Sequence, residues 1–95
     1  SPSDLLPLNG GYGACGWQIQ NGDHAVALGP VHWDSESYCG HTITAQYKGK
    51  SVTATVADLC PGCAGDHIDL TSSAMAVIDS SYINDRVITV NWHFN

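Results

Sequence analysis

The chain has 95 residues with nine acidic and three basic side chains, a formal net charge of −6 at pH 7. This charge repels nucleic acid and anionic membrane surfaces, and no apolar stretch approaches the length of a membrane-spanning helix. Only 13% of the residues are charged, and acids outnumber bases among them. We therefore expect a neutral or cationic partner. The length predicts one domain, residues 1–95, with a modest core.

The predicted elements are short strands and one small helix. Residues 1–10, and the Pro- and Gly-rich stretch as far as residue 13, predict an irregular N-terminal segment. Alternation of apolar and polar residues predicts strands at 17–20, 25–28, 41–47, 51–57 and 86–94, and a helical pattern occurs at 72–79. Lys48, Gly49 and Lys50 predict a hairpin turn. This all-β pattern favours a closed β-barrel, which leaves no strand edge exposed.

Two carboxylates flank a Cys-Pro-Gly-Cys turn at residues 60–63. One predicted strand ends at Asp58, and an extended run restarts after the turn and contains Asp69. Two strand ends that meet at one groove would hold both acids on a rigid frame. The alternative is a structural role for each acid. An Asp before a turn, such as Asp58, often accepts backbone hydrogen bonds, and Asp69 stands just before Thr71 and Ser72, which resemble a helix N-cap.

The four cysteines, Cys15, Cys39, Cys60 and Cys63, permit three disulfide pairings or a four-thiolate metal site. Structural zinc sites use two close pairs of ligands, whereas only Cys60 and Cys63 are close in sequence. We therefore expect disulfides, with no metal and no cofactor. A redox-active Cys-x-x-Cys is a further alternative, but it lacks the βαβ context that it needs.

Several aromatic residues are candidates for contact with a sugar ring. Trp17, Trp33 and Tyr38 lie in turns or at strand ends, although large aromatics in small barrels are usually core. Trp33 and Tyr38 are preferred, because Trp33 lies in a polar stretch and Tyr38 adjoins Cys39. Trp92 shares one strand face with apolar neighbours and is predicted to pack in the core.

Four motifs in order carry a resemblance to a known family: GACGW at 13–17, SYCG at 37–40, DLCPGC at 58–63 and HIDL at 67–70. They resemble expansin-like double-psi β-barrels, most of all the single-domain fungal loosenins, and VNWHF at 90–94 is similar to the closing strand of barwin. The resemblance implies a six-stranded double-psi β-barrel that is secreted and extracellular. It implies binding and loosening of cellulose, chitin or a related insoluble β-glycan without appreciable hydrolysis, and we expect a monomer.

The motifs also imply roles for single residues. Asp69 corresponds to the acid that family 45 glycoside hydrolases use as proton donor, and Asp58 to a second groove carboxylate of expansins. His67 belongs to the same HIDL motif and is a candidate contact for the glycan. Because two neighbouring carboxylates disfavour double ionisation, Asp69 is expected to hold its proton more readily than a free aspartate.

The barwin-like pattern implies two disulfides, Cys15 with Cys63 and Cys39 with Cys60. A local bridge from Cys60 to Cys63 would instead close a small, strained ring and connect no distant segments.

The start of the chain departs from the family pattern. The hydrolases carry their catalytic base in the first strand, whereas residues 6–12 here contain no acid. Asp4 lies too early and Asp23 lies in an apparent turn, so Tyr12 is the candidate for the first wall of the groove. Inverting hydrolysis needs two carboxyl groups about 6.5 to 9.5 Å apart. We therefore do not expect a hydrolytic enzyme.

Three functions follow from these features. The first is a nonenzymatic protein that loosens β-glycans with Asp69 and Asp58. The second is an enzyme, a lytic transglycosylase or weak glycan hydrolase, that uses Asp69 as its acid. The third is a barwin-like defence or protease-inhibitor domain that binds its partner through an outer loop.

Overall fold

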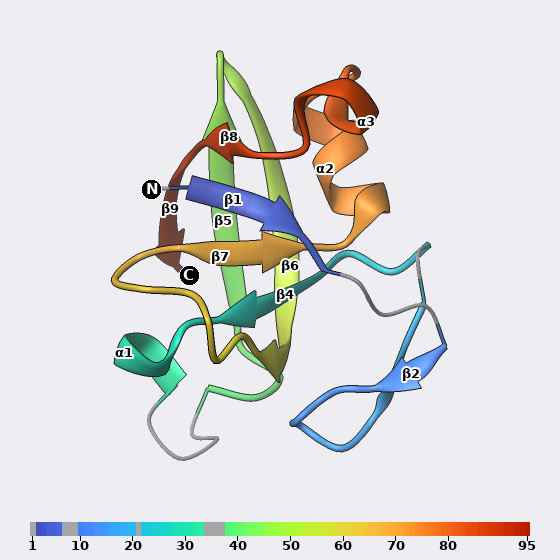
Figure 1. Cartoon of the computed structure of the whole chain (residues 1–95), viewed down its shortest axis with the longest axis vertical. Helices are drawn as coiled ribbons and strands as arrows, with labels where there is room; N and C mark the ends of the chain where they lie inside the picture. The colour runs from blue at the N-terminus through green and yellow to red at the C-terminus, as the bar shows by residue number, and fades with distance from the viewer. Residues whose placement is uncertain (1, 7–9, 21, 34–37) are drawn as a thin grey trace.

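The computed structural model describes residues 2–6, 10–20, 22–33 and 38–95. Figure 1 shows a strongly curved sheet with short helices at its margins. The sheet contains β1 (Pro2–Leu5), β4 (Ala25–Leu28), β5 (Thr42–Tyr47), β6 (Lys50–Leu59), β7 (Ile68–Leu70), β8 (Ile88–Thr89) and β9 (Asn91–Phe94). A separate two-stranded unit pairs β2 (Gly11–Tyr12) with β3 (Gln18–Ile19).

The strand order in the large sheet is β8-β1-β7-β4-β6-β5-β9. The two edge strands, β8 and β9, are separated in the chain only by Val90, so the sheet nearly closes on itself. When β8 and β9 are counted as one interrupted strand, the barrel has the six strands that the motifs implied. Two pairs are parallel, β1 with β7 and β4 with β6, and the others are antiparallel.

The core is filled by the inward-facing aliphatic side chains of the strands and by buried side chains of α2 (Ser72–Ile78), which packs against β6. Ala74, Met75 and Ile78 of α2 are buried, which confirms the helix predicted at 72–79. Thr71 stands at its N-cap, but its hydroxyl makes no cap hydrogen bond. The hydroxyl donates instead to the Asp23 carbonyl and accepts from the Ala25 N–H, and so ties the helix start to β4.

A second, smaller apolar cluster lies on the outer face of β4. Leu6, Ile19, Ala25, Ala27 and Ala57 are buried together there. Ile19 belongs to β3, so the β2–β3 unit covers this part of the barrel wall. The residues after β3 lead into β4, and the His24 carbonyl oxygen accepts a hydrogen bond from the Thr55 N–H in the middle of β6.

The structure corrects three local predictions. Residues 2–5 form β1 and are not irregular, because Pro at the first position of a strand does not interrupt the ladder. The strand predicted at 86–94 is divided into β8 and β9. Two short helices, α1 (Pro30–Trp33) and α3 (Tyr82–Asp85), were not predicted. None of the described helices is both long and apolar enough to cross a membrane.

All four cysteines form disulfides, but the expected pairing is wrong. The bridges join Cys15 with Cys39 and Cys60 with Cys63, with Cα atoms 5.7 and 5.4 Å apart. The 60–63 turn brings its own ends together, since the Cys63 N–H donates to the Cys60 carbonyl. The other two cysteines meet beside β6. The Cys15 N–H donates a hydrogen bond to the Ala57 carbonyl oxygen, and the N–H of Gly40, the residue after Cys39, donates to the Val56 carbonyl oxygen.

Candidate functional site

Four adjacent strands place a row of short side chains across the outer face of the barrel. Asp4 of β1 stands opposite Asp69 of β7, Asp69 opposite Ala27 of β4, and Ala27 opposite Asp58 of β6. Residues directly opposite on neighbouring strands project from the same face. The residues on either side of Asp69 are fully buried in the core. Asp4, Asp69 and Asp58, here called the acid row, therefore share the outer face.

Asp69 lies in the most crowded part of the acid row. One carboxylate oxygen each of Asp4 and Asp69 and one ring nitrogen of His67 all lie within 4.8 Å of one another. His67 Nε2 is 3.9 Å from Asp69 Oδ1. Burial, followed by repulsion from Asp4, raises the pKa of Asp69 to about 6, while His67 lowers it and Asp58 raises it. The expected direction is confirmed, and Asp4 is a larger cause than Asp58. Asp69 therefore holds a proton in mildly acidic solution.

Asp58 holds a loop in place. Its Oδ1 accepts hydrogen bonds from the Ala14 N–H at 2.7 Å and from its neighbour Leu59 at 2.8 Å. The loop approaches so closely that a Cβ on Gly13 would lie 2.4 Å from the Ala57 carbonyl oxygen. The structural alternative for Asp58 therefore has direct support, whereas a contact with ligand stays a prediction.

Two groups of potential metal ligands include Asp69. One combines it with Cys60 and Cys63, and the other with Asp4 and His67. The cysteines are bound in a disulfide, so Cys63 Sγ, 3.8 Å from Asp69 Oδ1, carries no thiol hydrogen and no ligating thiolate. The second group offers three donors, but the proton on Asp69 opposes cation binding below about pH 6. The expected absence of a metal stays a prediction.

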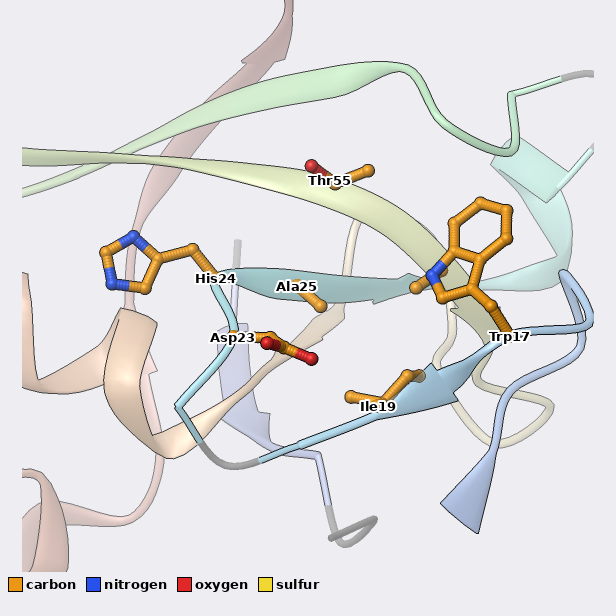
Figure 2. A pocket seen from close by; sticks show the side chains of 7 residues that line it. Trp17, Ile19, Asp23, His24, Ala25 and Thr55 are labelled. Carbon is orange, nitrogen blue, oxygen red and sulfur yellow. The ribbon is translucent and has the colours of Figure 1, made fainter. Parts of the chain in front are cut away.

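A cavity of about 330 Å³, here called the Trp17 cavity, opens between β3 and the strands β4 and β6. Figure 2 shows the Trp17 ring at one end and the His24 ring at the other, with the Asp23 carboxylate beside Ala25. Trp17 is 40% exposed. The lining residues are Trp17, Ile19, Asp23, His24, Ala25, Thr55 and Ala57. Because Ala57 precedes Asp58, the cavity adjoins the acid row.

A second cavity, of about 250 Å³, is here called the Trp92 cavity. It is lined by His32, Asp66, Trp92, His93 and Phe94. Trp92 packs against the core, as predicted, but it is only half-buried and the rest of its side chain faces this cavity. Sequence reasoning recognised the packed face and missed the open one.

The three other aromatic residues predicted to contact sugar, Tyr12, Trp33 and Tyr38, line neither cavity. Tyr12 is 72% exposed on β2. Trp33 and Tyr38 pack against the core from its edge, and the Tyr38 ring stacks on Phe94 with centroids 4.5 Å apart. The polar residues 34–37 between them lie outside the described part of the chain. Sugar binding by these three aromatics stays a prediction.

Asp4 is the candidate site residue that sequence reasoning set aside. The available signal was the alternation of Ser3, Asp4 and Leu5, in which Ser3 is buried and Leu5 packs on the core. This alternation places Asp4 on the outer face. Trp17 was considered but ranked below Trp33, although it directly precedes β3.

The amino-acid sequence matches no protein-family profile. It is 39% identical to an allergen Asp f 7 homolog of Arthroderma benhamiae over 96% of this chain, and 30% identical to a papain inhibitor of Streptomyces mobaraensis over 88%. The matches cover 38% of the first relative and 63% of the second. The chain thus spans less than two thirds of either protein.

Solved structures share the fold. The Streptomyces papain inhibitor superposes with a TM-score of 0.86 at 28% identity, over 98% of this chain and 89% of that one. A Clavibacter michiganensis expansin, an aspartate-to-asparagine mutant in complex with cellohexaose, gives 0.88 at 20% identity, over all of this chain and 48% of that one. These likenesses confirm the double-psi β-barrel that the motifs implied.

Proposed function

Because this chain belongs to the expansin-like and barwin-like double-psi β-barrel proteins, we propose that it binds and loosens neutral β-glycans without appreciable hydrolysis. The acid row and the Trp17 cavity form the proposed binding surface, and cellulose and chitin are the proposed polymers. The observation that carries this proposal is Asp69, which holds a proton up to about pH 6 beside Asp4.

A protonated carboxyl group next to a carboxylate complements sugar hydroxyls. The protonated Asp69 donates one hydrogen bond, whereas an ionised Asp4 only accepts. A hydroxyl group does both, so one sugar can bond to both acids. A net hydrogen bond contributes only about 0.5 to 1.5 kcal/mol. Exchange of an interchain hydrogen bond for a bond to the protein therefore costs little, and a polymer chain can be displaced without cleavage.

The spacing of the two acids disfavours inverting hydrolysis, while a retaining pair stands about 5 to 5.5 Å apart. Carboxylate oxygens of Asp4 and Asp69 lie within 4.8 Å. Inverting glycosidases separate their carboxyl groups by about 6.5 to 9.5 Å to leave room for the attacking water. Asp4 also accepts a hydrogen bond from the Leu5 N–H at 2.7 Å. Asp4 is therefore placed to adjust Asp69 rather than to activate water across a sugar ring.

Charge and surroundings favour a neutral polymer. The net charge of −6 and the acid row disfavour polyanions. The exposed Trp17 ring offers a flat apolar face, and Asp23, His24 and Thr55 supply polar groups around the same cavity. The cellohexaose complex of the expansin supports a β-glucan as a first ligand to test. Two disulfides favour an oxidising compartment, which fits the proposed secretion to the extracellular space.

The proposal is tested by pull-down on insoluble cellulose, chitin and peptidoglycan at pH 5 and pH 8, with wild type and Asp69→Asn. We expect glycan-dependent sedimentation and loss of filter-paper strength at pH 5, both reduced in the variant, with no release of reducing ends. Asp85→Asn, on the exposed helix α3, is the charge-matched control. Sedimentation and loosening that are unchanged in a folded Asp69→Asn variant would contradict the proposed role. Soluble fragments released only by wild type would favour the enzymatic alternative.

Protease inhibition is a second candidate. The specific observation is the papain inhibitor, which matches in sequence at 30% identity and in structure at a TM-score of 0.86. A titration of papain activity with wild type and Asp69→Asn tests it. Stoichiometric inhibition by both proteins, without binding to any glycan, would replace the glycan proposal with this one.

A further inference from the structure

The Trp92 indole is held from three sides. Its Nε1–H donates a hydrogen bond to the Asp66 carbonyl oxygen at 2.9 Å. The His32 ring meets it edge to face with centroids 5.1 Å apart, and the Phe94 ring does so at 5.3 Å. An aromatic ring fixed in this way loses little conformational entropy when a ligand stacks on it. The Trp92 cavity therefore contains a preorganised apolar platform.

Polar groups border the same platform. His32 Nε2 lies 2.6 Å from Asp66 Oδ1, and the two side chains are 27% and 63% exposed. Each partner keeps further hydrogen-bonding capacity, because a carboxylate accepts several bonds and an imidazole has two ring nitrogens. The cavity thus combines a flat ring with polar groups at its rim.

Size and polarity limit the occupant. At about 250 Å³, the cavity falls below the range of about 300 to 1,000 Å³ for pockets that bind drug-sized ligands. It suits a single small ring. A pyranose presents apolar C–H groups on its faces and hydroxyl groups around its edge, which match the indole and the His32–Asp66 pair. A purely apolar side chain would leave that polar pair without a new partner.

The location of the cavity connects it to the acid row. Asp66 precedes Asp69 by three residues, a stretch that spans at most about 11 Å when extended. In Figure 1, α1 with β9 and the β2–β3 unit lie on opposite sides of β4 and β7. The elements that carry His32 and Trp92 and the unit that carries Trp17 therefore lie on opposite sides of the strands that carry Asp69 and Ala27.

We propose that the Trp92 cavity is a second subsite, which holds one neutral sugar ring of the glycan that crosses the acid row. This inference rests on the proposed function. It also fixes the line along which the glycan lies, from the acid row to the Trp92 cavity. The ring stacks on Trp92, and its hydroxyl groups bond to His32 and Asp66.

The test is a titration of isotope-labelled protein with cellohexaose and with chitohexaose, followed through the backbone amide and indole N–H signals. Trp92→Phe assigns the Trp92 signal and removes its bond to Asp66. We expect the Trp17 and Trp92 signals to move together with one affinity. Trp92→Phe reduces the stacking face, and His32→Ala removes a hydrogen-bond partner. Each should weaken binding about threefold to tenfold. Asp85→Asn, on α3, which Figure 1 shows far from α1, should leave binding unchanged.

The possible failures are distinguishable. If signals of Trp17 and of the acid row respond while Trp92 does not, the second subsite is wrong and the proposed function stands. If no hexasaccharide moves any signal, both proposals fail. If Trp92 responds to papain and to neither sugar, the cavity is a protease contact and the subsite is also wrong. His32→Ala removes a partly exposed side chain and keeps the test valid if Trp92→Phe does not fold.

Discussion

Asp4 stands directly opposite Asp69 in the parallel β1–β7 pair, and the two carboxylates approach within 4.8 Å. Like charges at directly opposed positions destabilise a sheet. The pair is formed by distant parts of the chain and is accompanied by His67. A costly arrangement of this kind is typical of functional sites, where groups with displaced pKa values gather.

We predict that Asp69→Asn abolishes most of the loosening of cellulose or chitin at pH 5 without unfolding the protein. Asparagine keeps the shape of the side chain but has no titrating proton. The measurement is the loss of tensile strength of filter paper or chitin film, with circular dichroism as the folding check. Asp58→Asn should reduce loosening less, since its contact with the loop at Ala14 concerns geometry. Equal losses of loosening and of thermal midpoint in Asp69→Asn would identify Asp69 as a structural residue.

The second prediction concerns stability and pH. The pKa of Asp69 rises from 3.8 to about 6 on folding, so the folded state binds the extra proton between these values. Stability therefore falls as pH rises from about 4 to 6 and is constant above that range. Because Asp69 is partly exposed, the loss is on the order of 1 to 2 kcal/mol.

Asp69→Asn removes this loss. In chemical denaturation the variant should be more stable than wild type at pH 8, and the difference should shrink at pH 4. A difference that is independent of pH, or one of opposite sign, would contradict the raised pKa.

We predict that Asp4→Asn shifts the pH dependence of binding toward lower pH. Repulsion from Asp4 is the second cause of the raised pKa of Asp69, after burial, so its removal lowers that pKa. Asp58→Asn is the matched comparison within the acid row and should shift the profile less. The check is the midpoint of glycan binding against pH, or a carboxyl-carbon NMR titration of Asp69. A larger shift in Asp58→Asn than in Asp4→Asn would refute this ordering.

The fourth prediction concerns the disulfides. Peptide mapping under nonreducing conditions should find Cys15 joined to Cys39 and Cys60 joined to Cys63. Replacing both Cys15 and Cys39 by Ser should cost about 3 kcal/mol of unfolding free energy, because that bridge closes a loop with a separation of 24 residues. The short 60–63 loop should contribute less. Cross-linked peptides that join Cys39 to Cys60 would restore the barwin-like pairing.

The fifth prediction tests the loop beside the Trp17 cavity. In Gly13→Ala, the new Cβ would meet the Ala57 carbonyl oxygen at 2.4 Å and the Ile19 side chain at 2.7 Å. We expect the loop to move away from Asp58, with a loss of stability of about 1 to 3 kcal/mol and weaker glycan binding. Gly62→Ala is the control, since nothing lies within 4 Å of its Cβ. Equal stability of the two variants in denaturant titrations would contradict the close approach.

Local patterns determined much of the barrel. Alternation along 41–47 and 51–57, joined by the Lys48 turn, predicted the β5–β6 hairpin, and spacing of apolar residues predicted α2. Both signals report which face of a segment meets the core, and neighbours in the sequence carry that information. The same reasoning placed Asp58 and Asp69 on strands. The spacing of the cysteines supported the choice of disulfides over a metal site.

Only the tertiary structure decided what surrounds those residues. Asp4 faces Asp69 because β1 pairs in parallel with a strand distant in the chain, and no local pattern encodes that register. Cys15 and Cys39 meet because their two loops converge on β6. Trp92 keeps an open face because α1 and the segment at Asp66 border it without covering it. Sequence thus determined which side chains of a strand point away from the core. Long-range pairing decided which of these side chains meet, because the segments that carry them are distant in the chain and come together only on folding.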